Sequence, residues 1–317
     1  MTLADKKVSQ YRTKNRTGCI VKSFFGCSAL FLIFFVIVIL IIISIEIPEI
    51  EFTKTEKKEY TIEFDSLTNE NIVKASFSWG FVDNALRRRK YDLNFRLLEK
   101  DVKSAMNYID KLASMNYTDL GLQSRFSDPE TEARTVWAEV YRRVYNFSVP
   151  QMQNVLEGFN RIFLEEKFPS NDKIQFVISF IQNITYGRPG GALDLFPPIG
   201  TIAYRYGDCD TKALLLYVIL EKMGVDCAML WSYNYKHAML GIKVSGRGNY
   251  LTTNGKKYYF LETTYPNWNI GNLPPEFNNT RFWFIEEIDS PELQQKLIEQ
   301  IEEKDSQRGG KPIPAKP

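Results

Sequence analysis

The longest apolar segment of the chain runs from Phe24 to Ile45, where twenty-two consecutive residues carry no charge. At about 1.5 Å per residue, a helix of this length reaches the roughly 30 Å of a bilayer core. A cleaved signal peptide has a shorter apolar region and a small-residue cleavage site, whereas this segment is followed by Glu46-Ile47-Pro48-Glu49. The pattern predicts an uncleaved transmembrane anchor at 24–45 that contacts membrane lipid.

The charges before this segment predict its orientation. Residues 1–23 carry six basic residues against Asp5 alone, which leaves 34 basic and 37 acidic residues in the remainder of the chain. Because positive charge stays on the cytoplasmic side, we expect a cytoplasmic tail at 1–23 and an extracytoplasmic domain after the anchor. The near-neutral remainder lacks the basic surface of a nucleic-acid-binding protein, so nucleic acid is not an expected partner.

The region after the anchor begins with a charged, aperiodic spacer at 46–59 and continues as a mixed β/α region at 60–150. Within that region, 72–79 and 91–97 alternate apolar and polar residues as half-buried strands do, and 99–116 and 130–146 have helical periodicity. The basic run Arg87 to Lys90 between the strands is interpreted as a solvated loop, with contact to anionic polymer or lipid headgroups as an alternative. The region is either a small domain that presents substrate or an N-terminal elaboration of the domain that follows.

The next region, 151–288, has two more helical patterns, at 150–166 and 171–184, followed by a Gly/Pro-rich loop from Gly187 to Gly200. The glycines of this loop lack the spacing of a Walker or dinucleotide motif, so we expect no cofactor. Residues 289–317 are predicted to form a polar helix and a disordered tail.

The segment around Cys209 has the features of a helix start. Gly207 and Asp208 are typical of a turn and an N-cap, and apolar residues then recur at helical spacing up to Gly224. Cys209 would therefore lie in the first turn of a buried helix, where unpaired N–H groups and the helix dipole favour thiolate and lower the pKa of a cysteine. Asp208 and Asp210 oppose this effect if both are charged, so a neighbouring imidazolium would have to supply most of the stabilisation.

His237 is the single histidine of the chain and opens a strand pattern, 237–244, which a turn-rich stretch separates from a second strand pattern, 256–263. If the two strands close symmetrically around Asn249 and Tyr250, Val244 lies opposite Gly255 and His237 lies opposite Glu262. Directly opposed residues point to the same face of a sheet, so this spacing gives the histidine an acid partner. A slip of one residue would break the pairing.

Simpler interpretations exist for each residue alone. A lone histidine is usually structural, a cysteine on an apolar helix is usually part of the core, and two extracytoplasmic cysteines can form a disulfide. Cys227 lies inside an apolar strand pattern and is better suited to a buried free thiol than to a bond with Cys209. The ordered set of a helix-opening cysteine, the histidine and an acid across a hairpin favours a Cys-His-acid site.

The motifs that carry these residues resemble the transglutaminase-like superfamily. They are Gly207-Asp208-Cys209-Asp210, the following Lys212-Ala213-Leu214, Met223-Gly224-Val225, His237-Ala238 and Tyr258 to Thr264, with weaker similarity at 176–186 and 268–271. The resemblance covers about residues 160–285 and is closest to the prokaryotic branch. It implies an α+β, papain-like core in which the cysteine helix packs on an antiparallel sheet that carries the histidine and the acid. The third position is more often Asp in the superfamily, whereas this chain has Glu262.

Together these observations predict a membrane-anchored extracytoplasmic cysteine peptidase or amidase, with Cys209 as nucleophile, His237 as base and Glu262 as the orienting acid. The expected oxyanion donors are the Cys209 N–H and one side chain. The candidates for that side chain are Gln182, Tyr204 and Tyr206. The expected substrate is an envelope protein or a peptide-bearing polymer, and no metal is expected. The alternatives are a cross-linking transglutaminase and a non-catalytic, membrane-tethered binding module of the same fold.

Overall fold

The computed structural model describes residues 56–63, 71–122 and 125–288. The cytoplasmic tail, the transmembrane segment and the C-terminal tail predicted at 1–23, 24–45 and 289–317 lie outside these residues. Within the described part, no helix combines the length and the apolar character that crossing a bilayer requires. Residues from Thr55 onward belong to one compact unit, and the fold below is that of its described residues.

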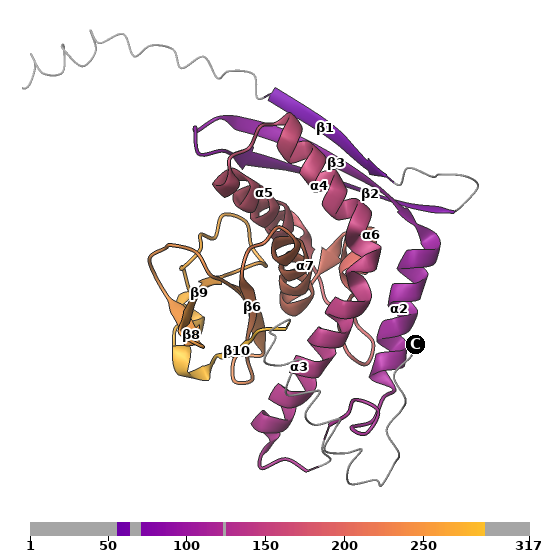
Figure 1. The fold of residues 1–317 in the computed structure, drawn as a ribbon, viewed down its shortest axis with the longest axis vertical. Coiled ribbons are helices and arrows are strands. Elements are labelled where there is room, and N and C mark those ends of the chain that lie inside the picture. Colours follow the sequence, from indigo (N-terminus) through magenta and orange to yellow (C-terminus); the bar gives the residue numbers. More distant parts are fainter. Residues whose placement is uncertain (1–55, 64–70, 123–124, 289–317) are drawn as a thin grey trace, which may run out of the picture. The chain divides into compact units, whose positions relative to one another are not determined.

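A small mixed sheet forms one end of the unit (Figure 1). Its strands are β1 (Glu56–Glu63), β2 (Ile72–Val82) and β3 (Arg88–Leu98). β2 and β3 form an antiparallel hairpin, and β1 pairs with β3 in parallel, so that the order is β1-β3-β2. β1 begins at Glu56, so the last four residues of the predicted spacer at 46–59 belong to this strand.

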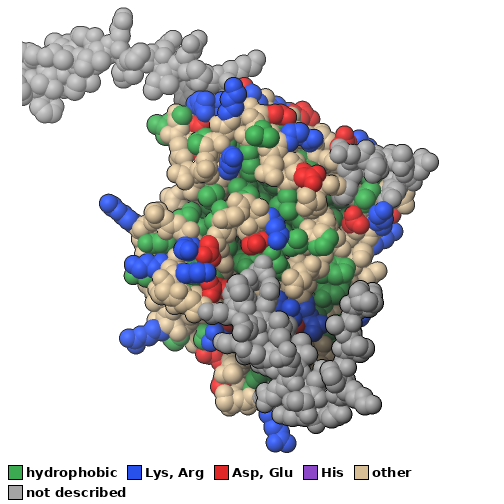
Figure 2. Space-filling view, viewed as in Figure 1, with side chains coloured by type: hydrophobic (Ala, Val, Ile, Leu, Met, Phe, Trp, Pro, Cys, Tyr) green, Lys and Arg blue, Asp and Glu red, His purple; other side chains and the backbone are tan. Residues whose placement is uncertain are grey.

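The basic run Arg87 to Lys90 is not the loop that the sequence predicted, because β3 begins at Arg88. Arg88 and Lys90 point to the outer, solvated face of the sheet, where alternation along the strand places them. Arg89 points to the other face and forms ion pairs with Glu56 and Glu166. Figure 2 shows Lys and Arg side chains gathered at the end of the molecule where β1 begins.

Six helices are described, and five of them follow the predicted ones closely. Their bounds are α2 (Glu99–Ala113), α3 (Pro129–Ser148), α4 (Gln153–Glu165), α5 (Ser170–Asn183), α6 (Pro198–Tyr204) and α7 (Cys209–Lys222). α6 was not predicted, since Pro198 and Gly200 read as loop residues; Pro198 instead occupies the first helical turn, where proline is tolerated. α7 lies in the middle of the unit, and its residues from Ala213 to Leu220 are all buried (Figure 1).

The second sheet is antiparallel, five-stranded and nearly closed into a barrel-like form. Its strands are β6 (Cys227–Ser232), β7 (His237–Ile242), β8 (Tyr250–Thr253), β9 (Lys256–Leu261) and β10 (Phe284–Glu286). They lie in the order β10-β6-β7-β9-β8. A further pair of two-residue strands, β4 (Thr185–Tyr186) and β5 (Tyr206–Gly207), runs in parallel just before α7. Helices and mostly antiparallel strands of this kind confirm the predicted α+β class.

The two regions predicted at 60–150 and 151–288 share one hydrophobic core. Phe95 of the first sheet packs against Phe180 of α5, with ring centroids 5.8 Å apart, and Tyr145 of α3 packs against Tyr217 of α7 at 5.5 Å. Aromatic contacts at these distances are typical of a single close-packed interior. The described residues of 60–150 therefore belong to the same compact unit as Cys209.

Candidate active site

Cys209 is the first residue of α7, as the sequence predicted. Asp208 caps the helix, because its side chain accepts a hydrogen bond from the backbone N–H of Thr211. Gly207 is required by close packing: a Cβ at this position would lie 2.7 Å from a side-chain carbon of Thr211. The Gly-Asp-Cys order thus places the sulfur at the end of a rigid, buried helix.

Two acids, Asp208 and Asp210, flank Cys209. Asp208 and Asp210 are joined by a side-chain hydrogen bond, and the hydroxyl of Tyr141 lies 3.3 Å from Oδ2 of Asp210. Burial and the charge of Asp208 hold the pKa of Asp210 well above its usual value. Asp210 is therefore harder to ionise beside Asp208 than an ordinary aspartate is.

The pKa of the Cys209 thiol is raised, contrary to the expectation from the helix dipole. Burial is the largest cause, and the charges of Asp210 and Asp208 act in the same direction. The backbone N–H groups of Ala238 and Asp210 point at the sulfur and oppose the shift without overcoming it. One donor to the sulfur therefore comes from the start of α7 and one from β7, but the neutral thiol is still favoured.

His237 and Glu262 are in contact: Nε2 of the imidazole lies 2.8 Å from Oε2 of the carboxylate. The predicted register is wrong, because Leu240 pairs with Leu261 and Glu262 falls two positions away from the position opposite His237. The error arises because β8 and a turn at Asn254 and Gly255 lie between the two strands. A shift of two residues leaves both side chains on the same face of the sheet, so the contact forms across the diagonal.

Glu262 is held at both carboxylate oxygens. Oε2 contacts His237, and Oε1 accepts hydrogen bonds from the backbone N–H and the hydroxyl of Thr264, at 2.7 and 2.6 Å. Burial raises the pKa of Glu262, but the hydrogen bond and charge of His237 and the Thr264 donors outweigh it and hold the pKa below its usual value. The acid is therefore an ionised, fixed partner for the imidazole.

Besides the contact with Glu262, two aromatic rings hold the imidazole of His237 in place. The ring of Phe277 stacks on His237 with centroids 4.5 Å apart, and the ring of Trp283 meets it edge-on at 6.1 Å. The side chain of His237 is 12% exposed. Phe277 and Trp283 lie far along the chain from His237, and no sequence motif pointed to them.

Cys209 and His237 both line a cavity of about 450 Å³. One wall is a stripe of α3, where Ala133, Trp137 and Tyr141 lie one turn apart on one helix face. Its other lining groups include Tyr186 and Trp231. No sequence pattern predicted a role for α3 in the site, because its aromatic stripe is indistinguishable from an ordinary core face.

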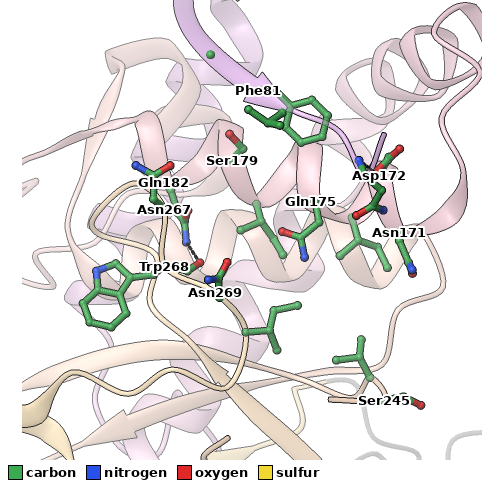
Figure 3. Close-up of a pocket in the computed structure, with 17 residues that line it drawn as sticks. Phe81, Asn171, Asp172, Gln175, Ser179, Gln182, Ser245, Asn267, Trp268 and Asn269 are labelled. Atoms are coloured by element: carbon green, nitrogen blue, oxygen red, sulfur yellow. Dashed lines mark hydrogen bonds between the residues drawn. The ribbon is translucent and has the colours of Figure 1, made fainter. Parts of the chain in front are cut away.

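Gln182 is not an oxyanion donor in this structure. Its Nε2 donates to the backbone carbonyls of Glu262 and Trp268, both at 2.9 Å, which uses both amide hydrogens. The side chain lines a second cavity, of about 520 Å³, beside α5 (Figure 3). In that view Gln182 points toward the backbone of Trp268, and the amides of Asn267 and Asn269 are among the other labelled groups.

The predicted Tyr204 and Tyr206 do not line the Cys209 cavity, whereas Tyr186 does. Tyr204 and Tyr206 instead pack their rings against Phe196, each with centroids 5.1 Å apart. Tyr186 pairs with Gly207 across β4 and β5, which brings its side chain to the start of α7. Burial and the nearby Cys209 and Asp208 raise the pKa of its hydroxyl, which therefore stays protonated as a hydrogen-bond donor.

Lys212, one turn after Cys209, is completely buried. Its Nζ donates to the carbonyl oxygens of Ile184 at 2.7 Å and of Gln182 and Thr264, each at 3.3 Å. Burial lowers the pKa of Lys212 to about 8. The lysine thus connects the end of α5, the cysteine helix and the segment that follows Glu262.

Cys209 and Cys227 are both free thiols, and Cys227 is buried, which removes the disulfide alternative. Across the described ranges, no group of three or more His, Cys, Asp or Glu side chains is arranged to hold a metal ion. Comparisons of the chain with protein-family models, curated proteins and solved structures found no match.

Proposed function

We propose that the protein is a membrane-anchored extracytoplasmic cysteine hydrolase of the transglutaminase-like kind, a peptidase or amidase that works by acyl transfer. The observation that carries this proposal is the 2.8 Å contact between His237 and Glu262, since His237 lines the same cavity as the helix-opening Cys209. A Cys-His pair oriented by an acid is the arrangement that activates a thiol for attack on a carbonyl.

The contact with Glu262 supports Nδ1 as the imidazole nitrogen that takes the proton. Nε2 is hydrogen-bonded to the carboxylate of Glu262, so in the neutral ring Nε2 carries the hydrogen and Nδ1 is the free base. Because the pKa of the Cys209 thiol is raised, the proton passes to Nδ1 as the sulfur attacks, rather than before the substrate binds.

Attack forms a bond between the sulfur and the carbonyl carbon. The imidazolium then gives its proton to the leaving amine as the carbon–nitrogen bond breaks, and a thioester remains on Cys209. A water molecule, deprotonated by Nδ1, attacks the thioester and releases the acid and the thiol. Glu262 stays ionised through the cycle and stabilises the imidazolium, which its low pKa allows.

The negative oxygen of the intermediate needs two donors. The N–H of Cys209 lies in the first turn of α7, where backbone N–H groups have no partner within the helix. We assign the second donor to the hydroxyl of Tyr186, because its ring lines the cavity and its proton is retained.

The cavity favours an extended acyl donor such as a peptide segment over a small amide. Its volume of about 450 Å³ and its aromatic wall on α3 suit a chain several atoms longer than the reacting group. The predicted anchor at 24–45 places such a substrate at the outer membrane surface, as an envelope protein or a peptide-bearing polymer.

Acylation by p-nitrophenyl acetate tests the proposed chemistry without knowledge of the natural substrate. The detergent-solubilised full chain should release a burst of p-nitrophenolate, and mass spectrometry should find the acetyl group on the peptide that contains Cys209. Cys209→Ala should abolish the burst, whereas Cys227→Ala should keep it, since Cys227 is buried away from the cavity. An equal burst from Cys209→Ala would exclude the proposal. Addition of a primary amine distinguishes a transferase, because it would yield the amide in place of acetate.

A further inference from the structure

The turn between β2 and β3 presents a leucine to solvent in a fixed conformation. Leu86 is 84% exposed, the largest value among the exposed apolar residues of the described chain, and its backbone is left-handed with φ +60°. This conformation costs a non-glycine residue about 1 kcal/mol or more. A polar residue or glycine would serve the turn better, so the position is not explained by folding alone.

The turn is rigid because the buried Asp83 organises it. The Asp83 carbonyl accepts the N–H of Leu86 at 2.9 Å, and its carboxylate accepts the backbone N–H and Nε of Arg87 at 2.9 and 2.6 Å. The N–H of Asn84 donates to Asp172 of α5 at 3.0 Å, which fixes the turn to the helix beneath it. Leu86 is thus held outward by a preformed loop.

The leucine is surrounded by positive charge. Arg88 lies directly opposite Val82 on the outer face of the hairpin, and Lys90 follows on the same face. Val82 is 50% exposed. Among the described residues Arg88 and Lys90 have no ion-pair partner. We call Val82, Leu86, Arg87, Arg88 and Lys90 the hairpin tip.

The carboxylates nearest the hairpin tip are already neutralised. Glu56 and Glu166 form ion pairs with Arg89, and Asp83 forms one with Arg87. The surplus charge at the hairpin tip is therefore positive, in agreement with the Lys and Arg side chains visible at this end in Figure 2.

A short stretch of sequence separates β1 from the predicted anchor. β1 pairs with β3 in parallel, and its first residue, Glu56, lies beside Arg89 and therefore near the hairpin tip. Only eleven positions separate Glu56 from Ile45, the last residue of the predicted transmembrane segment. Even a fully extended chain of that length spans no more than about 40 Å.

A second exposed apolar residue lies at the same end. Leu164, near the end of α4, is 75% exposed, and its neighbour Glu166 contacts Tyr60 of β1 and Arg89 of β3. Lys167 follows in the left-handed conformation, with φ +53°. Two acids, Glu165 and Glu166, directly follow Leu164, so only Leu86 combines an exposed apolar side chain with basic neighbours. That combination is the feature of a surface that inserts into an anionic lipid interface.

We propose that the hairpin tip docks on the outer surface of the bilayer that holds the anchor, with Leu86 inserted among the acyl chains and Arg88 and Lys90 on anionic headgroups. Docking gives the tethered domain one orientation on the membrane. This proposal depends on the predicted anchor and not on the proposed catalytic activity.

Hydrogen exchange of the full chain in lipid nanodiscs tests the docking. Nanodiscs of phosphatidylcholine alone are compared with nanodiscs that contain about 30% phosphatidylglycerol, in low salt. We expect amide exchange in peptides that cover 83–90 to slow at least about threefold in the anionic nanodiscs, and the difference to vanish near 0.5 M salt.

Variants distinguish docking through the hairpin tip from an attraction of the whole positively charged surface to anionic lipid. Leu86→Asp and the double variant Arg88→Glu/Lys90→Glu should each remove the lipid dependence. Lys74→Glu should retain it, because Lys74 lies on the same outer face toward the opposite end of the hairpin, paired with Arg96. Equal exchange rates in the two kinds of nanodisc overturn the proposal. Equal protection in lipid-free detergent micelles also overturns it, since a protein contact would then cover the hairpin tip.

Discussion

Nε2 of His237 lies 2.8 Å from Oε2 of Glu262, and this contact joins the first residue of β7 to the residue that follows β9. Two strands of the buried sheet therefore determine the position of the imidazole. The two Thr264 donors occupy the other carboxylate oxygen, so the acid has no freedom to rotate away from the ring. A site fixed in this way depends on the charge of Glu262 as well as on its position.

Glu262→Gln tests that charge. The amide has nearly the same size but cannot stabilise an imidazolium, so kcat for p-nitrophenyl acetate should fall about a hundredfold or more. Glu286→Gln is the matched control, because Glu286 is also a buried glutamate of this sheet, paired with Arg134, and does not line the cavity. If Glu262→Gln and Glu286→Gln have equal kcat, Glu262 does not orient the base.

The raised pKa of Cys209 predicts a specific pH dependence of alkylation. Because iodoacetamide reacts with the thiolate, its rate constant at Cys209 should rise about tenfold per pH unit from pH 7 to 9, without a plateau. The rate is measured on the Cys209 peptide by mass spectrometry, in a Cys227→Ala background. A plateau below pH 8 would mean that a thiolate–imidazolium pair exists in the free protein and that the neutral-pair mechanism is wrong.

Lys212 predicts a contribution to stability that varies with pH. Its pKa is about 8 in the folded protein against an ordinary value of 10.5, so between these values the unfolded chain binds more protons. The free energy of unfolding that Lys212 contributes therefore increases as pH rises through this window, by about 2 kcal/mol between pH 8 and 10.

The test compares the free energies of unfolding of the wild type and a Lys212 variant, because the titration of all other groups cancels in their difference. Unfolding of the wild type and of Lys212→Met is followed at pH 8 and at pH 10. The wild type should gain about 2 kcal/mol relative to the variant across this range. A constant difference would show that Lys212 has an ordinary pKa, and hence that it is less buried than its three carbonyl contacts indicate.

The parts of the site that the sequence predicted are those set by local signals. Asp208 as an N-cap and Cys209 as a helix start follow from the order of residues, and the structure confirms both. The predicted register of β7 and β9 was wrong because β8 lies between them in the sequence and pairs with β9. Asn254-Gly255, a strong signal for a two-residue hairpin turn, marks the turn between β8 and β9. The contact between His237 and Glu262 still forms, because the predicted register was wrong by two residues and a shift of two residues keeps both side chains on the same face of the sheet.

The remaining parts of the site depend on contacts between distant segments. Phe277 stacks on His237 and Trp137 lines the cavity from α3, and neither residue lies near a recognisable motif. Gln182 contacts the backbone of Glu262, but its amide does not point into the cavity as an oxyanion donor would. The direction of a side-chain amide depends on the carbonyls that surround it, and the sequence does not show these. Sequence patterns give the faces of helices and strands, but not which faces meet.

Tyr186 and Gln182 give opposite predictions, which test the assignment of the oxyanion donor. Tyr186→Phe removes one hydroxyl from a half-exposed side chain, so kcat should fall about ten- to a hundredfold while the melting temperature is unchanged. Gln182→Met leaves two carbonyls without a donor, so it should lower the free energy of unfolding by about 1–3 kcal/mol. Its effect on kcat should be smaller, because it acts through the position of Glu262. If Gln182→Met lowers kcat more than Tyr186→Phe does and leaves stability unchanged, the amide of Gln182 turns to the substrate during catalysis and the assignment to Tyr186 is wrong.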